Sequence, residues 1–187
     1  MFKERFARVQ EKAQRLKQLR LCKPPLFSCP ENWNAPAEEA EVLAFEHAFR
    51  VQLPPDYREF ILHIGNGGLG PGFGLISLSP SEVVPFPNLW NSKQNDFFKM
   101  EDLSFHEQME GGLSLRIAQV HPALTDVMVI RGADVGQIWR RDTFAESASL
   151  FETPFDKHTI GVARKPATFL DCYEDWMDNA LSEEQAR

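Results

Sequence analysis

The first residues that could do chemistry form a glycine cluster, Gly65-Asn66-Gly67-Gly68-Leu69-Gly70, which matches the spacing G-x-G-x-x-G. In a dinucleotide site such glycines follow a strand and open a helix, whose positive N-terminal end meets the pyrophosphate. Here the cluster follows a predicted helix and precedes a predicted strand, so the helix would turn its negative end toward a phosphate. The cluster is therefore interpreted as a helix C-cap and a turn, because glycine and asparagine accept positive φ angles.

Other side chains that act in catalysis or metal binding are scattered. The five histidines never pair at the three- or four-residue spacing of a helix-borne metal site. Three pairs of carboxylates stand in polar surroundings, which predicts solvated groups rather than a buried acid–base pair: Glu38 with Glu39, Glu101 with Asp102, and Asp171 with Asp175. The sequence predicts no metal, no cofactor and no enzymatic activity; the alternative is an active site assembled from residues far apart in the chain.

An acidic and aromatic stretch is the predicted partner-binding surface. The candidate contact residues are Trp90, Asp96, Glu101, Asp102, Glu107 and Glu110. In a protein interface, aromatic side chains supply buried area and carboxylates steer a basic partner into place. The alternative is an insertion whose aromatic residues complete the core while its acids stay solvated.

The glycine cluster must be positioned by a helix, which we predict over residues 54–64. Pro54 and Pro55 can open a helix because its first turn needs no backbone N–H groups from them. The apolar residues that then fall on one face at helical spacing are Tyr57, Phe60, Ile61 and Ile64.

Residues 2–21 are predicted to form a basic amphipathic helix. Its apolar stripe consists of Phe2, Phe6, Val9, Ala13 and Leu16. Eight basic and two acidic residues give residues 1–23 a net charge of +6, so with −7 overall the rest carries −13. We interpret the helix as docked on the body by its stripe; the alternatives are a membrane-surface helix, a mitochondrial presequence and a dimerisation helix.

The remaining segments predict one domain. Residues 24–36 form a proline-rich linker, residues 37–181 the domain, with an irregular insertion at about 85–112, and residues 182–187 a tail. Further helices are predicted over 37–50 and 166–181, and strands over 75–78, 113–117, 127–130 and 137–140, the last two joined as a hairpin. This order predicts an α+β fold, in which N-terminal and C-terminal helices pack against a mostly antiparallel central sheet.

Several of these segments together resemble the SUKH superfamily, which includes a fungal cell-wall-assembly regulator and many bacterial toxin-immunity proteins. Members show a helix with a central Glu, then Leu-Pro-x-x-Tyr-x-x-Phe, then Asn-Gly-Gly, a glycine turn before an aromatic strand, and a closing helix with Trp. The resemblance covers roughly residues 38–180. The matching residues, which we expect to be mainly structural, are Glu46, Leu53, Pro54, Tyr57, Phe60, Asn66, Gly67, Gly68, Gly136, Trp139 and Trp176.

The resemblance implies a non-enzymatic protein-binding domain, most simply an immunity protein that neutralises a cognate toxin by direct binding. A scaffold that binds endogenous partners, as in the cell-wall-regulator relatives, is the alternative. The acidic body predicts a basic partner and no binding to nucleic acid. Because no apolar run approaches 18 residues, no apolar leader precedes the first helix and the three cysteines form no close pair, we expect a cytoplasmic protein that does not insert into membranes. The sequence leaves the oligomeric state open.

Overall fold

The computed structural model describes residues 2–19, 30–86, 112–132, 134–142, 147–150 and 166–185, and the description below refers to these ranges. Its helices are α1 (Phe2–Leu19), α2 (Glu39–Phe49), α3 (Pro55–His63) and α5 (Phe169–Gln185), with a short 3-10 helix η1 (Pro80–Glu82). Its strands are β1 (Val83–Phe86), β2 (Gly112–His121), β3 (Leu124–Arg131), β4 (Ile138–Asp142) and β5 (Ser147–Leu150).

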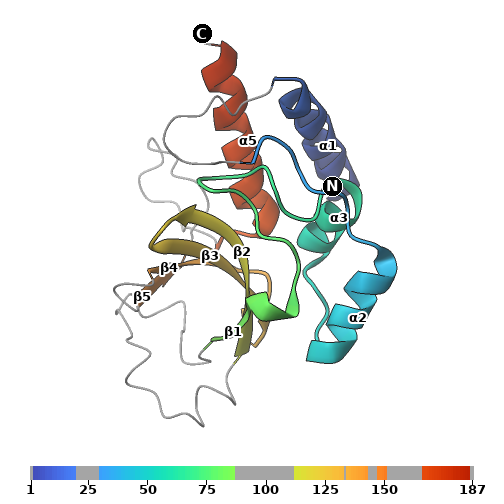
Figure 1. Ribbon diagram of the computed structural model, residues 1–187, viewed down its shortest axis with the longest axis vertical. Coiled ribbons are helices and arrows are strands. Elements are labelled where there is room, and N and C mark those ends of the chain that lie inside the picture. Colours follow the sequence, from blue (N-terminus) through green and yellow to red (C-terminus); the bar gives the residue numbers. More distant parts are fainter. Residues whose placement is uncertain are drawn as a thin grey trace.

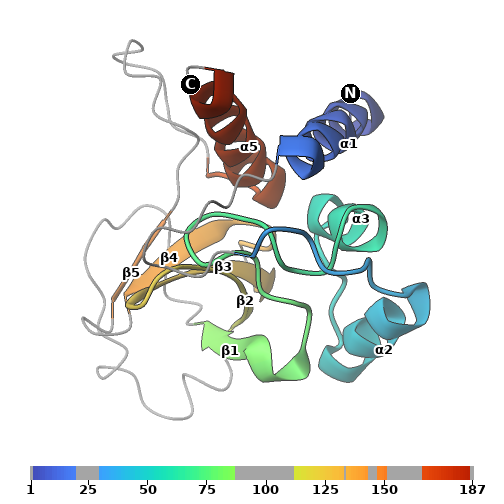
Figure 2. The same ribbon diagram turned by 45° about the horizontal axis from the view of Figure 1, so that its top comes forward.

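The strands form one antiparallel sheet in the order β1-β2-β3-β4-β5, so each strand pairs with its neighbour in the chain. Both views show the helices on one side of this sheet, with α2 at the edge of the molecule (Figures 1 and 2). The predicted α+β class, the helices at both termini and the hairpin between β3 and β4 are confirmed.

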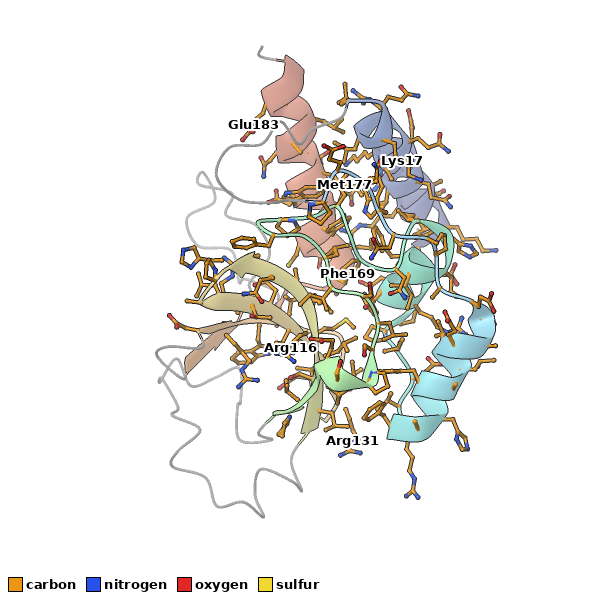
Figure 3. All side chains as sticks on the ribbon, in the orientation of Figure 1. Lys17, Arg116, Arg131, Phe169, Met177 and Glu183 are labelled. Atoms are coloured by element: carbon orange, nitrogen blue, oxygen red, sulfur yellow. The ribbon has the colours of Figure 1, made fainter. Side chains whose placement is uncertain are left out.

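The core lies between the sheet and the helices. Leu115, Met128 and Ile138 occupy matching positions on three adjacent strands and are fully buried. Phe169 of α5 lies where that helix, α3 and the sheet meet (Figure 3), and its ring contacts Phe60 of α3 at a centroid distance of 5.1 Å. Burying an aromatic or aliphatic side chain of this size stabilises a fold by about 1.5–3 kcal/mol.

The interpretation of α1 as a docked helix is confirmed. Four of its five stripe residues, Phe6, Val9, Ala13 and Leu16, are buried in the core cluster, whereas Phe2 is 43% exposed. Basic side chains of α1 also pair with carboxylates of α5, since Arg5 contacts Asp171 and Glu174 at 2.7 and 2.8 Å. The apolar stripe from Phe6 to Leu16 is therefore packed inside the molecule.

Two predicted elements differ in the structure. The strand expected over residues 75–78 is wrong, because only Leu75 makes isolated bridges, to Gly68 and Ala118. The backbone bonds of this segment are divided between two partners, because Leu75 and Gly68 exchange both N–H···O bonds whereas Ile76 donates to Ile117 of β2. The strand predicted at 113–117 is longer, because β2 continues to His121 through register shifts that interrupt the alternation of buried and exposed residues.

Candidate protein-interaction surface

The motif residue Glu46 connects α2 to α3. Its Oε1 atom accepts the backbone N–H of Leu53 at 2.8 Å and lies 3.6 Å from Nε of Arg58. Arg58 also donates to Glu39, and this hydrogen bond raises the pKa of the guanidinium further above its ordinary value. Leu53 is buried beneath the connection. Glu46 therefore fixes the angle between two helices and presents no free carboxylate to a substrate.

The motif residues that open α3 are also part of the core. Pro54 is the N-cap and Pro55 the first helical residue, as the sequence predicts. Tyr57 and Phe60 are buried, and Tyr57 packs edge-on against Phe169 at 5.0 Å. The Tyr57 hydroxyl has no hydrogen-bond partner within the described part of the chain. Burial raises its pKa well above the ordinary value, so the phenol stays protonated.

The glycine cluster forms the turn at the exit from α3, as predicted, but the C-cap of the helix is Ile64 in a right-handed conformation and not a glycine. Gly67 and Gly68 have φ angles of 87° and 96°, which side chains other than glycine rarely adopt. A β-carbon on Gly68 would lie 2.4 Å from the backbone oxygen of Asn32. Asn66 accepts the backbone N–H of Leu78 at 2.7 Å through its side-chain oxygen. The C-terminal end of α3 faces the cluster, an orientation that disfavours a phosphate.

Two aromatic residues outside this loop hold it in place. The Trp33 indole donates to the Tyr173 hydroxyl at 2.8 Å, and that hydroxyl donates to the backbone oxygen of Leu69. The motif residue Trp176 stacks on Tyr173 at 5.1 Å. Trp33 and Tyr173 are 140 positions apart in the chain, so the sequence gives no sign of the hydrogen bond that joins them.

The remaining motif residues lie on the β3–β4 hairpin. Gly136 has a φ angle of 91° and donates its N–H to Val129 in the turn. Trp139 is paired with Val127 of β3 and Leu150 of β5, and it is 7% exposed. Because side chains alternate along a strand, Trp139 lies on the sheet face opposite Ile138 and the main core. The structure thus gives every motif residue an intramolecular role.

The described residues do not assemble a recognisable reactive centre. No group of three His, Cys, Asp or Glu residues among them could hold a metal ion. Cys172 is half-buried, and desolvation raises the pKa of its thiol to about 12, which keeps it protonated and unreactive. No described helix has both the length and the apolar character needed to cross a bilayer. The predicted contact residues Trp90, Asp96, Glu101, Asp102, Glu107 and Glu110 lie outside the described residues.

The outer face of α2 is the surface feature that the sequence analysis missed. It consists of Ala40, Leu43, Ala44 and His47, all exposed. Leu43 is 52% exposed, more than any other large apolar residue that the structure describes. The signal was present in the sequence, because Ala40, Leu43 and Ala44 add apolar positions to the inward-facing Val42, Phe45 and Phe49. On this side of the helix, the exposed carboxylates of Glu39 and Glu41 lie at the edges and the apolar residues at the centre.

The charge of the chain is concentrated near this helix. Residues 30–86, which include α2 and α3, contain eight carboxylates against two arginines. Residues 112–150, which form most of the sheet, contain four carboxylates and four arginines. The basic side chains of α1 are partly neutralised by α5, as in the contacts of Lys12 with Glu174 and Asp178 at 3.0 and 2.7 Å. The largest unbalanced acidic segment therefore includes the α2 outer face.

Comparison with known families agrees with this geometry. The model of the SMI1 / KNR4 family (SUKH-1) matches residues 36–149, more than half of the 187 residues. The match begins just before α2 and ends in β5, so α1 and α5 lie outside it. No curated protein and no solved structure matches the chain. The resemblance drawn from the sequence motifs is confirmed: the chain belongs to the SMI1 / KNR4 family (SUKH-1).

Proposed function

We propose that this protein is an immunity protein, which binds a cognate basic toxin in the cytoplasm and blocks it by covering its functional surface. The SMI1 / KNR4 family consists of protein-interaction domains that are generally non-catalytic. The proposal adds to this general role a specific class of partner and the consequence of binding it.

The observation that carries the proposal is the separation of charge along the chain. Residues 30–86 contain eight carboxylates and two arginines. Arg58 pairs with Glu39 and Glu46, and Arg116 of β2 pairs with Glu82, whereas Glu38 and Glu41 are exposed. Nucleases and other toxins that act on nucleic acid need basic surfaces to hold phosphates. An acidic surface attracts such a protein over several ångströms and accelerates the encounter.

Blocking by coverage needs a rigid surface rather than reactive groups. The Glu46 contact, the glycine turn and the Trp33–Tyr173 hydrogen bond each fix one connection of the scaffold. A preorganised surface loses little conformational freedom when it binds, which favours a tight complex. The acidic residues predicted at positions 96–110, outside the described ranges, are proposed as additional contacts.

The test is to co-express the chain with the products of the genes that neighbour its own, beginning with any toxin domain among them. We expect restored growth of the host cells and a one-to-one complex on gel filtration, with a toxin from an unrelated immunity pair as the control. Continued killing together with the absence of a complex would overturn the proposed function.

A further inference from the structure

The outer face of α2 has an apolar centre, with the exposed carboxylates Glu39 and Glu41 at its edges. The inward-facing Val42 and Phe45 are buried, while Leu43 on the opposite side is 52% exposed. By contrast, the stripe of α1 is covered, because Phe6, Val9, Ala13 and Leu16 lie in the core. An apolar centre with a charged rim is the usual composition of a protein-binding surface. Within the described structure, only one side of α2 is covered.

Acidic groups stand at one end of this face. Glu38 and Glu41 form a capping box at the start of α2, and both are exposed. The rest of residues 30–86 adds to the acidic surplus. Arg50, the C-cap of α2, is exposed at the other end, so it is the N-terminal end of the face that is complementary to a surface rich in lysine or arginine.

The shape of α2 indicates which molecule covers its outer face, a second copy of the chain or a different protein. The helix has 11 residues, so it is about 16 Å long, and it lies at the edge of the molecule (Figures 1 and 2). Two such convex helices would touch along a narrow line and would bury less than the roughly 1,000 Å² that a stable interface needs. A groove can contact a helix on both flanks, and small residues such as Ala40 and Ala44 allow its walls to approach closely.

We propose that α2 inserts its outer face into a groove of the partner, with Leu43 as the apolar anchor and the groove lined at its rim by basic residues. This inference rests on the proposed function and identifies the element that makes the contact. Such a groove is the place where a toxin that acts on nucleic acid would hold its substrate, so insertion of α2 would exclude that substrate.

The test measures binding of three single-residue variants to the neighbouring toxin domain by calorimetry. Leu43→Glu introduces a charge at the anchor, and Ala44→Arg introduces bulk and positive charge beside it. Leu19→Glu is the matched control, because Leu19 is 36% exposed and ends α1, a different helix from α2. We expect the first two variants to weaken binding at least tenfold and the control to change it less than threefold. Circular dichroism and the melting temperature should show all three folded, since each site is exposed.

Each outcome separates this inference from the proposed function. If the wild-type complex forms and Leu43→Glu and Ala44→Arg bind as the wild type does, α2 is not the inserted element, although the immunity role stands. If the chain alone forms a dimer that Leu43→Glu disrupts, the face is occupied by a second copy, and the inference is overturned. If the wild-type protein forms no complex with the toxin domain, both the inference and the proposed function fail.

Discussion

At the scale of single residues, the two tyrosines of the chain have similar ring contacts but differ in the hydrogen bonding of their hydroxyl groups. Tyr57 and Tyr173 both pack against Phe169, at centroid distances of 5.0 and 5.4 Å. The Tyr173 hydroxyl accepts from Trp33 and donates to Leu69, whereas the Tyr57 hydroxyl is buried with no partner among the described residues. The ring of Tyr57 stabilises the fold, but its hydroxyl does not.

Replacing each tyrosine by phenylalanine tests this difference. Tyr173→Phe removes two hydrogen bonds and leaves the Trp33 indole unpaired, so we expect the free energy of unfolding to fall by about 2 kcal/mol. Tyr57→Phe removes only a desolvated hydroxyl, so we expect a rise of up to about 1 kcal/mol. Urea denaturation of both variants gives the comparison, and a loss of 2 kcal/mol or more in Tyr57→Phe would show that its hydroxyl has a partner.

Two glycines with similar backbone angles provide a second test. Gly68 and Gly136 have φ angles of 96° and 91°, so alanine at either position costs about 1–2 kcal/mol of backbone strain. A β-carbon at Gly68 would also lie 2.4 Å from a backbone oxygen, whereas at Gly136 its nearest neighbours are side-chain atoms of Pro54 at 3.7 Å. We expect Gly68→Ala to destabilise the protein by more than about 3 kcal/mol and Gly136→Ala by about 1 kcal/mol. Equal losses in thermal denaturation would contradict the packing of the glycine turn.

At the scale of elements, α1 and α5 form a charged pair outside the region that the family model matches. Desolvation alone would raise the pKa values of Asp171 and Glu174, but hydrogen bonds to these carboxylates, including those from Arg5, outweigh it and lower both pKa values. Desolvation likewise opposes the charge of Lys12, yet its hydrogen bonds to Asp178 and Glu174 raise the pKa of the ammonium group. The contacts of Arg5 and Lys12 with Asp171 and Glu174 are partly buried, so salt screens them less than the exposed contact of Lys12 with Asp178.

These shifts predict how stability depends on pH. A carboxylate with a lowered folded pKa contributes stability above its unfolded pKa, and this contribution is lost as the pH falls. We therefore expect the free energy of unfolding to decrease by roughly 1 kcal/mol as the pH falls from about 5 to 3 because of Asp171 and Glu174. The raised pKa of Lys12 acts in the opposite sense, so its contribution is lost only above about pH 10.

The measurement is urea denaturation from pH 7 to pH 3 for the wild type and two variants. Glu174→Gln should be less stable at pH 7 and less sensitive to acid. Glu183→Gln is the control on the same helix (Figure 3), because Glu183 is exposed and has no ion pair with any described residue. If Glu174→Gln and Glu183→Gln respond to pH alike, the α1–α5 ion pairs do not contribute to stability.

The elements were predictable wherever local chemistry and tertiary packing agree. Pro54, Pro55 and the spacing of Tyr57 and Phe60 predict α3 almost to its ends, and the glycines predict its exit. The β3–β4 hairpin was predictable because Gly136 separates two apolar runs. In each case one short window of sequence contains both the element and its boundary.

The remaining features depend on contacts between distant segments. β5 has no β-branched residue, and its backbone is extended because β4 offers a pairing partner. The residues around Leu75 are apolar enough for a strand, but their backbone bonds are divided between the glycine turn and β2. The exposure of the outer face of α2 was not predictable from the sequence. A helical pattern shows which residues can face the core, but it does not show which residues other segments leave exposed.

At the scale of the whole molecule, a neutral sheet supports an acidic helical half. Residues 112–150 contain equal numbers of carboxylates and arginines, whereas residues 30–86 contain six more carboxylates than arginines. The core and the motif residues fix the scaffold, while the surplus and the α2 outer face remain at its surface. This division of roles fits a protein that holds its shape while a partner docks, and it favours electrostatic steering of a basic protein.

The most direct test of this account is calorimetric titration of the full chain with the neighbouring toxin domain at 50 and 500 mM salt. The account predicts a one-to-one complex whose affinity falls at least tenfold at the higher salt concentration, because exposed carboxylates supply much of the attraction. The absence of binding, or an affinity that does not change with salt, would contradict it.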